Sequence, residues 1–64
     1  MPWVKIDLTE GRTPEQKQAA AQAITDAMVK HCGCPPESVS IVFNDVSNEN
    51  WAFGGLLASN RQAS

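Results

Sequence analysis

This sequence has few residues that could form a disulfide bond or bind a structural metal ion, the cross-links that stabilise many small proteins. It contains two cysteines, Cys32 and Cys34, and one histidine, His31. A disulfide between the cysteines would close a very small, strained ring, and these three neighbours do not supply the four spaced ligands of a structural zinc site. A chain of 64 residues buries only about 60% of its unfolded surface. We therefore expect one domain, residues 1–64, that is stabilised by self-assembly.

Positive charge is also sparse. Five lysine and arginine residues lie scattered along the chain against seven acidic residues, which leaves no basic stripe for binding nucleic acid. No apolar run reaches the ~18 residues of a membrane-spanning helix, and the first residues lack the charged and then apolar pattern of a secretory signal. These absences predict a cytoplasmic protein that binds neither nucleic acid nor a membrane and keeps its thiols reduced.

Two segments have the alternating pattern of β-strands. In residues 3–8, Val4, Ile6 and Leu8 share one face, as in a half-buried strand. In residues 39–44 the apolar residues lie on both faces, which predicts a more buried strand. Since a helix is predicted between them, the two strands should lie parallel in a β-α-β unit.

The helix between these strands has clear signals at both ends. Thr13, Pro14 and Gln16 form a capping box with a proline at the first helical position, and Gly33 stops the helix after about residue 30 or 31. Apolar residues recur at three- and four-residue steps, and we expect them to form one stripe: Ala20, Ala23, Ile24, Ala27, Met28 and His31.

The rest of the chain predicts a turn and a small aromatic arm. Residues 47–50 are polar, and residues 51–55 are aromatic and end in paired glycines, which predicts a short hairpin. We expect the tail, residues 56–64, to dock on a neighbouring subunit. Two strands and one helix leave sheet edges open, a liability that pairing with another copy removes. The fold class predicted is α/β (α+β): one β-α-β unit with a carboxy-terminal hairpin, assembled into an oligomer.

Pro2, directly after the initiator methionine, is the unusual feature for chemistry. Removal of Met1 would give Pro2 a free secondary amine, and α-amino groups have an ordinary pKa near ~8, far below that of lysine. A nearby cation and apolar walls would lower the pKa of this amine further, which would make it a capable general base. Position alone also fits a simpler interpretation, in which Pro2 merely begins an edge strand.

The order of residues resembles the 4-oxalocrotonate tautomerase family over nearly the whole chain, without a gap. The resemblance rests on the proline start, the run around Arg12 and two later stretches: Pro2-x-x-x-Ile6-x-x-x-Glu10-Gly11-Arg12-Thr13-x-Glu15-Gln16-Lys17, Ser38-Val39-x-Ile41 and Trp51-Ala52-Phe53-Gly54-Gly55-x-Leu57-Ala58-Ser59. It implies a β-α-β fold assembled as a hexamer, with an active site at each amino-terminal proline that is shared between subunits. It also implies tautomerisation of small unsaturated 2-oxo or enol acids, as in the catabolism of aromatic compounds.

The same resemblance implies a role for each matched residue. Pro2 would act as the base and then as the acid. Arg12 would hold a substrate carboxylate, for which its planar fork is suited, and the backbone N–H of Thr9 would help to polarise the substrate through a water. Trp51 stands where the family has an aromatic pocket wall, which would help to keep the amine neutral. No cofactor or metal is implied.

Ser40 departs from the family pattern. The best-studied members have a second arginine at this place on the second strand, where it binds the 2-oxo group and the adjacent carboxylate. A serine donates one neutral hydrogen bond, roughly half as strong as a charge-assisted one, and losing one such donor can cost on the order of 10²–10³ in rate. Either the substrate carries one anionic group fewer, or another donor has replaced the arginine. Asn44 and Arg61 are the candidates.

We therefore predict a cofactor-independent keto–enol tautomerase that acts on a small anionic substrate as a homo-oligomer, with a hexamer favoured. One alternative is a relative that hydrates haloacrylates or decarboxylates a semialdehyde. Another is a non-catalytic subunit of a mixed oligomer, in which Ser40 would mark the loss of activity. Trp3, beside Pro2, would be either a pocket wall or a subunit contact.

Overall fold

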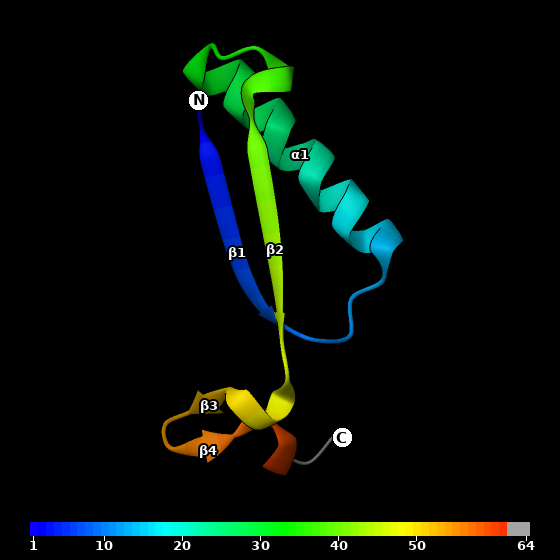
Figure 1. Cartoon of the computed structure of the whole chain (residues 1–64), viewed down its shortest axis with the longest axis vertical. Helices are drawn as coiled ribbons and strands as arrows, with labels where there is room; N and C mark the ends of the chain where they lie inside the picture. The colour runs from blue at the N-terminus through cyan, green and yellow to red at the C-terminus, as the bar shows by residue number, and fades with distance from the viewer. Residues whose placement is uncertain (62–64) are drawn as a thin grey trace.

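The computed structural model describes residues 1–61 and consists of a β-α-β unit followed by a hairpin arm (Figure 1). Strands and helices follow in the order β1 (Trp3–Thr9), α1 (Pro14–Cys32), η1 (Pro36–Ser38), β2 (Ser40–Val46), η2 (Asn48–Asn50), β3 (Ala52–Phe53), β4 (Leu56–Leu57) and η3 (Ala58–Asn60), where η denotes a short 3-10 helix. The predicted fold class and the presence of a hairpin are confirmed, but the second strand of the hairpin, Leu56–Leu57, comes from the segment that was expected to be a docking tail. The last three positions of the expected docking tail, 62–64, lie outside the described residues.

The two long strands are parallel, as predicted. Trp3 pairs with Ser40 at one end and Thr9 with Val46 at the other. Half-buried and exposed side chains alternate along both strands, because successive side chains of a strand point to opposite faces. The half-buried set matches the predicted inner face: Val4, Ile6, Leu8, Ile41 and Phe43. Since α1 runs beside the sheet (Figure 1), we infer that this is the face that α1 covers.

Helix α1 begins as predicted. The Thr13 hydroxyl accepts a hydrogen bond from the Gln16 backbone N–H at 3.1 Å, and the Gln16 side chain accepts one from the Thr13 N–H at 2.9 Å. The helix ends at Cys32, and Gly33 follows in the left-handed region with φ 71°, which costs glycine no steric strain. The backbone N–H of Gly33 donates to the Val29 carbonyl and closes the last turn.

The predicted apolar stripe of α1 was partly wrong. Ala20, Ile24 and Met28 are half-buried, but Ala23, Ala27 and His31 are exposed. Other residues are half-buried in their place: Lys17, Ala21, Thr25 and Val29. The chain returns past the helix here: η1 contacts α1, and the Cys34 thiol donates to the Met28 carbonyl at 3.4 Å. A pattern of alanines does not reveal such a return path.

The arm is a tight hairpin. Ala52 pairs with Leu57 and Phe53 with Leu56, and the connecting glycines have φ angles of 56° and 89°. Two consecutive positive φ values are what a two-residue turn of this kind requires. In Figure 1 the arm extends beyond the carboxyl end of β2, at the opposite end of the molecule from the amino terminus.

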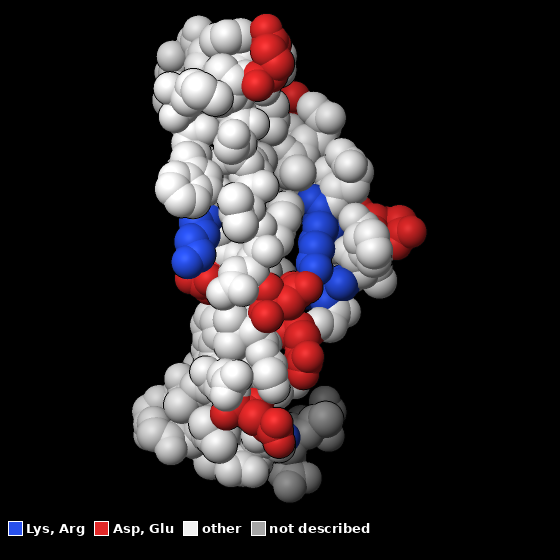
Figure 2. Space-filling view, in the orientation of Figure 1, with Lys and Arg blue, Asp and Glu red and all other residues white. Residues whose placement is uncertain are grey.

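Residues 1–61 contain no fully buried side chain, so the described chain has no closed hydrophobic core. Large apolar side chains lie open instead on the sheet face that α1 does not cover and on the arm: Trp3, Val42, Phe53, Leu56 and Leu57. No helix in residues 1–61 has the length and hydrophobicity needed to cross a membrane. Figure 2 shows acidic side chains spread along one face and basic ones mainly in two separate places, so that face has no continuous basic stripe.

Candidate active site

Pro2 is held by its carbonyl group rather than by its nitrogen. The Ser40 backbone N–H donates to the Pro2 carbonyl oxygen at 3.0 Å, which extends the parallel pairing of β1 and β2 by one residue. Pro2 itself is half-buried, whereas Met1 is 97% exposed. Met1 therefore contributes almost nothing to packing, and its removal would leave the anchored proline in place.

Ser40 lies beside Pro2 and Trp3. Its backbone fixes the Pro2 carbonyl, and it is the register partner of Trp3. Ser40 and Trp3 are both exposed, and paired residues of neighbouring strands point to the same face. This end of the sheet thus brings together two of the predicted site residues, Pro2 and Ser40.

Arg12 and Thr9 meet at the opposite end of β1. One terminal nitrogen of Arg12, Nη1, donates to both the backbone carbonyl and the hydroxyl of Thr9, each at 3.0 Å. A guanidinium has five N–H donors, and within residues 1–61 these two bonds use Nη1 alone. The loop is thereby fixed while other donors of Arg12 remain available for a ligand.

An ion pair that the sequence did not reveal supports this loop. The Lys17 ammonium, in the first turns of α1, pairs with the carboxylate of Asp45 near the end of β2. Leu8 is the register partner of Asp45, so the pair ties the helix start to the strand end next to Thr9. Lys17 and Asp45 are 28 positions apart, and only the strand register could have indicated their proximity.

The predicted site residues therefore form two groups in one chain. Seven residue steps of extended strand separate Pro2 from Thr9, and at ~3.3 Å per residue these span about 23 Å. No side chain bridges that distance. A site that contains both Pro2 and Arg12 needs residues from more than one chain.

Trp51 belongs to the arm. It follows η2, is half-buried, and its carbonyl accepts a hydrogen bond from the Ala58 N–H at 2.7 Å. Its ring lies 6.4 Å from that of Phe53, tilted by 41°, a typical aromatic arrangement. Trp51 is thus grouped with the carboxyl end of the chain, away from Pro2 of the same chain.

The two candidate replacements for the missing arginine differ in their surroundings. The Asn44 side-chain amide donates to the Asp7 carboxylate at 2.9 Å, and Asn44 lies four residues along β2 from Ser40, about 13 Å away. The Arg61 guanidinium lies over the Phe53 ring, with Cζ 4.6 Å from the ring centroid. Asn44 is therefore already engaged, whereas Arg61 is placed in the arm next to Trp51.

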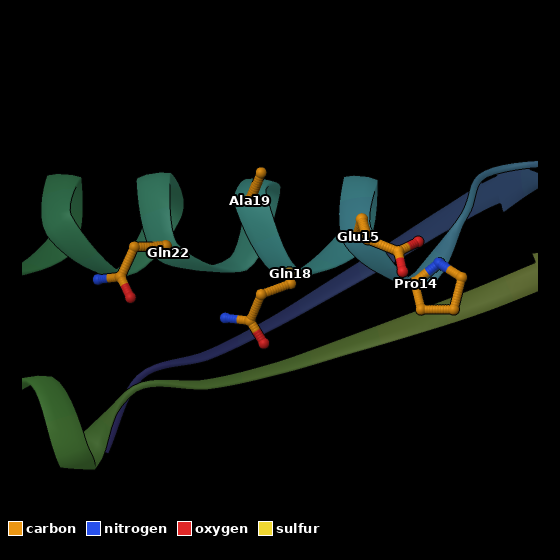
Figure 3. Close-up of a pocket in the computed structure, with 5 residues that line it drawn as sticks. All are labelled: Pro14, Glu15, Gln18, Ala19 and Gln22. Carbon is orange, nitrogen blue, oxygen red and sulfur yellow. The ribbon is translucent and has the colours of Figure 1, made fainter.

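The described residues contain grooves, but these do not coincide with either group. A groove of about 550 Å³ lies along one flank of α1, with Gln18 and Gln22 extending from the helix (Figure 3). Its lining consists of Pro14, Glu15, Gln18, Ala19 and Gln22. Within residues 1–61 no group of three or more histidine, cysteine or acidic side chains is arranged to hold a metal ion.

Comparison with known proteins identifies relatives of this chain. A sequence profile described as "Tautomerase enzyme" matches residues 2–61. The 2-hydroxymuconate tautomerase of Comamonas testosteroni is 40% identical over 58 residues, which are 91% of this chain and 92% of that protein.

Two solved structures have the same fold. A 4-oxalocrotonate tautomerase isozyme from Methylibium petroleiphilum has a TM-score of 0.86 and 45% identity, covering 91% of this chain and 94% of that one. A heterohexameric 4-oxalocrotonate tautomerase from Chloroflexus aurantiacus J-10-fl has a TM-score of 0.90 and 27% identity, covering 97% of this chain and all of that one. With its fold, its profile match and these relatives, the chain belongs to the tautomerase family and, within it, to the 4-oxalocrotonate tautomerases.

Proposed function

We propose that this protein is a cofactor-independent tautomerase of small unsaturated 2-oxo or enol acids, with the amine of Pro2 as general base and then general acid. The placement of Pro2 carries the proposal: its carbonyl is fixed by Ser40 while the residue before it, Met1, is 97% exposed. Loss of Met1 frees the nitrogen of a proline whose backbone position is already fixed. The Comamonas relative, named for 2-hydroxymuconate, supports an enol acid as the class of substrate.

In the proposed reaction the neutral amine of Pro2 removes a proton from the enol acid. The negative charge spreads over the conjugated system, and the protonated amine then returns the proton to a carbon atom further along it. Arg12 holds a carboxylate of the substrate and stabilises the developing charge. The backbone N–H of Thr9 helps to polarise the substrate through a water, and its carbonyl and hydroxyl position Arg12. Trp51 covers the pocket and keeps the amine neutral by excluding water.

The proposed enzyme is a homo-oligomer, with a hexamer favoured. The span of about 23 Å between Pro2 and Thr9 in one chain requires that Arg12 reach Pro2 from a neighbouring subunit. The exposed apolar side chains and the lack of a closed core within residues 1–61 supply the surface for such assembly. The relative from Chloroflexus aurantiacus is described as a heterohexamer, which supports six subunits.

Subunit mixing tests this proposal. One chain retains Met1, which converts the Pro2 nitrogen into an amide without basicity; the other is processed and carries Arg12→Ala. At low 2-hydroxymuconate concentration the chain that retains Met1 should be inactive alone, and Arg12→Ala alone should be only weakly active because its KM is raised. Equal amounts unfolded and refolded together should regain about a quarter of the wild-type sites, since a site then draws Pro2 from one chain and Arg12 from the other.

Refolded wild type is the control for recovery, and analytical ultracentrifugation verifies that each sample assembles. Full activity in chains shown by mass spectrometry to retain Met1 would exclude Pro2 as the base. Assembled mixtures that regain nothing would exclude a shared site.

Ser40 supports a second candidate function, the non-catalytic subunit of a mixed oligomer. It places a neutral hydroxyl where the best-studied members have an arginine. Under this alternative the processed, assembled protein ketonises neither 2-hydroxymuconate nor phenylenolpyruvate faster than buffer does.

The single-domain organisation and the cytoplasmic location stay predictions.

A further inference from the structure

Arg61, which follows η3 beside the hairpin arm, carries a charge that has no role in the site proposed above. The Arg61 guanidinium lies over Phe53, with Cζ 4.6 Å from the ring centroid, and the Phe53 ring lies 6.4 Å from that of Trp51. Two backbone hydrogen bonds fix this arrangement: Ala58 N–H to the Trp51 carbonyl at 2.7 Å and Arg61 N–H to the Ala58 carbonyl at 3.1 Å. Arg61, Phe53 and the proposed pocket wall Trp51 are thus parts of one cluster.

Stacking leaves the binding edges of a guanidinium available. The contact with an aromatic ring uses the face of the planar cation, whereas its N–H donors point outward from the edges. Within residues 1–61 the salt bridge is the one between Lys17 and Asp45, so no described carboxylate occupies Arg61. A guanidinium with N–H donors available at its edges suits a carboxylate, which its planar fork can bind with two hydrogen bonds.

The position of Arg61 along the molecule fits a substrate contact. In Figure 1 the arm and the loop that leads from β1 to α1 both lie at the end opposite the amino terminus. That end carries Thr9, Arg12 and Trp51, the residues that a neighbouring chain contributes to a Pro2 site under the proposed function. The amino-terminal end offers only the neutral Ser40 in place of a second arginine, and Asn44 is held by Asp7.

We propose that Arg61 binds the second carboxylate of a dicarboxylate substrate and so takes over the charge that is absent at Ser40. This inference rests on the proposed function, since it places Arg61 beside the Pro2 amine of a neighbouring subunit. One arm then contributes two things to the site: Trp51 as an apolar wall and Arg61 as an anion anchor. Specificity for dicarboxylates over monocarboxylates follows from the pair Arg12 and Arg61.

Binding of two unreactive acids tests the inference apart from catalysis. Muconate and sorbate share a six-carbon diene and differ in having two carboxylates or one, and neither has an enol to turn over. Calorimetric titration of assembled, processed protein should show that Arg61→Ala weakens muconate binding at least about tenfold, as expected for a lost charge-assisted hydrogen bond. Sorbate binding should change less than about threefold, since it uses one anchor.

Three further measurements complete the test. Arg61→Lys keeps the charge without the fork, and its muconate affinity should fall between those of wild type and Arg61→Ala; it carries the test if the alanine variant does not assemble. Gln18→Glu, on the flank of α1 (Figure 3), makes the same change in net charge and should bind both acids as wild type does. In steady-state kinetics, Arg61→Ala should lower kcat/KM for 2-hydroxymuconate at least about tenfold and barely change it for phenylenolpyruvate.

The outcomes separate the two proposals. Equal losses for muconate and sorbate, or no loss for either, overturn the role of Arg61. A wild type that binds muconate through Arg61 but ketonises nothing overturns the proposed function and leaves the binding site standing.

Discussion

The exposure of Trp3 on the open sheet face allows its contribution to the free energy of assembly to be estimated. This side chain is 71% exposed on the face that α1 does not cover. A buried tryptophan removes up to roughly 250 Å² from water, so about 175 Å² of Trp3 remains for a neighbouring subunit to cover. At ~25 cal/mol per Å² this area is worth about 4 kcal/mol per subunit. Alanine retains the β-carbon, so Trp3→Ala should weaken assembly by about 3 kcal/mol per subunit.

That loss is large enough to measure directly. Each 1.4 kcal/mol is a tenfold change in an equilibrium constant, so the concentration at which the oligomer is half assembled should rise about 100-fold. Sedimentation velocity over a dilution series gives this midpoint. Because no side chain in residues 1–61 is fully buried, dissociation should also unfold the chain, and the Tm of Trp3→Ala should depend more steeply on protein concentration than that of wild type.

Gln18→Ala is the matched control. Gln18 lies on the flank of α1, away from the open sheet face, and alanine is a better helix former than glutamine. Its assembly midpoint should equal that of wild type. If Trp3→Ala assembles at the wild-type midpoint, Trp3 is not a subunit contact and the area argument fails. A change confined to kcat/KM would instead make Trp3 a wall of the substrate pocket.

The remaining predictions concern the site and the helix start. Arg12→Ala should raise KM for an anionic enol and should raise the pKa of the Pro2 amine, because a nearby cation disfavours its protonated form; the acid limb of the kcat/KM profile then moves to higher pH. Ser40→Arg should raise kcat for 2-hydroxymuconate, where a tenfold gain equals about 1.4 kcal/mol, and no gain would show that the side chain does not reach the pocket. Thr13→Ala removes the bond to the Gln16 N–H and should cost about 1 kcal/mol per subunit in urea unfolding, whereas Thr13→Ser should retain most of it.

The sequence predicted most of the fold because its local signals agree with one another. The alternation in residues 3–8 and the cap at Thr13 mark element boundaries that depend on nearby residues alone, and the structure has them within a residue or two. The paired glycines of the arm have the positive φ angles that their turn requires. Such features are decided within a few residues, where propensity and pattern are sufficient.

Features set by distant segments were missed. Ala23 and Ala27 were expected to be covered, but Ala21 and Thr25 are half-buried instead, on the flank where they line a groove with Pro36 and Glu37. The pair of Lys17 and Asp45 depends on the strand register and on the angle of the helix. Neither quantity can be obtained from the periodicity of one segment.

The candidate site was predicted only in part. Its residues were named from a resemblance, and their roles stay predictions. What the structure adds is their division into two groups, with Pro2 and Ser40 at one end of β1 and Thr9 and Arg12 at the other. Sequence order alone does not show this, since ten residues span about 15 Å in a helix and about 33 Å in a strand.

Under the proposed function, stability and catalysis are coupled in this chain. If Arg12 and Pro2 meet only after assembly, as proposed, a substitution at a subunit contact changes the number of complete sites even where it touches no reacting atom. Such a variant loses kcat per chain while the surviving sites keep the wild-type KM. A variant of a residue in the site changes KM or kcat while the molecular mass of the oligomer stays that of wild type. Measuring the molecular mass of the oligomer and both kinetic constants at the same protein concentration therefore tests the interface role predicted for Trp3 separately from the binding role proposed for Arg61.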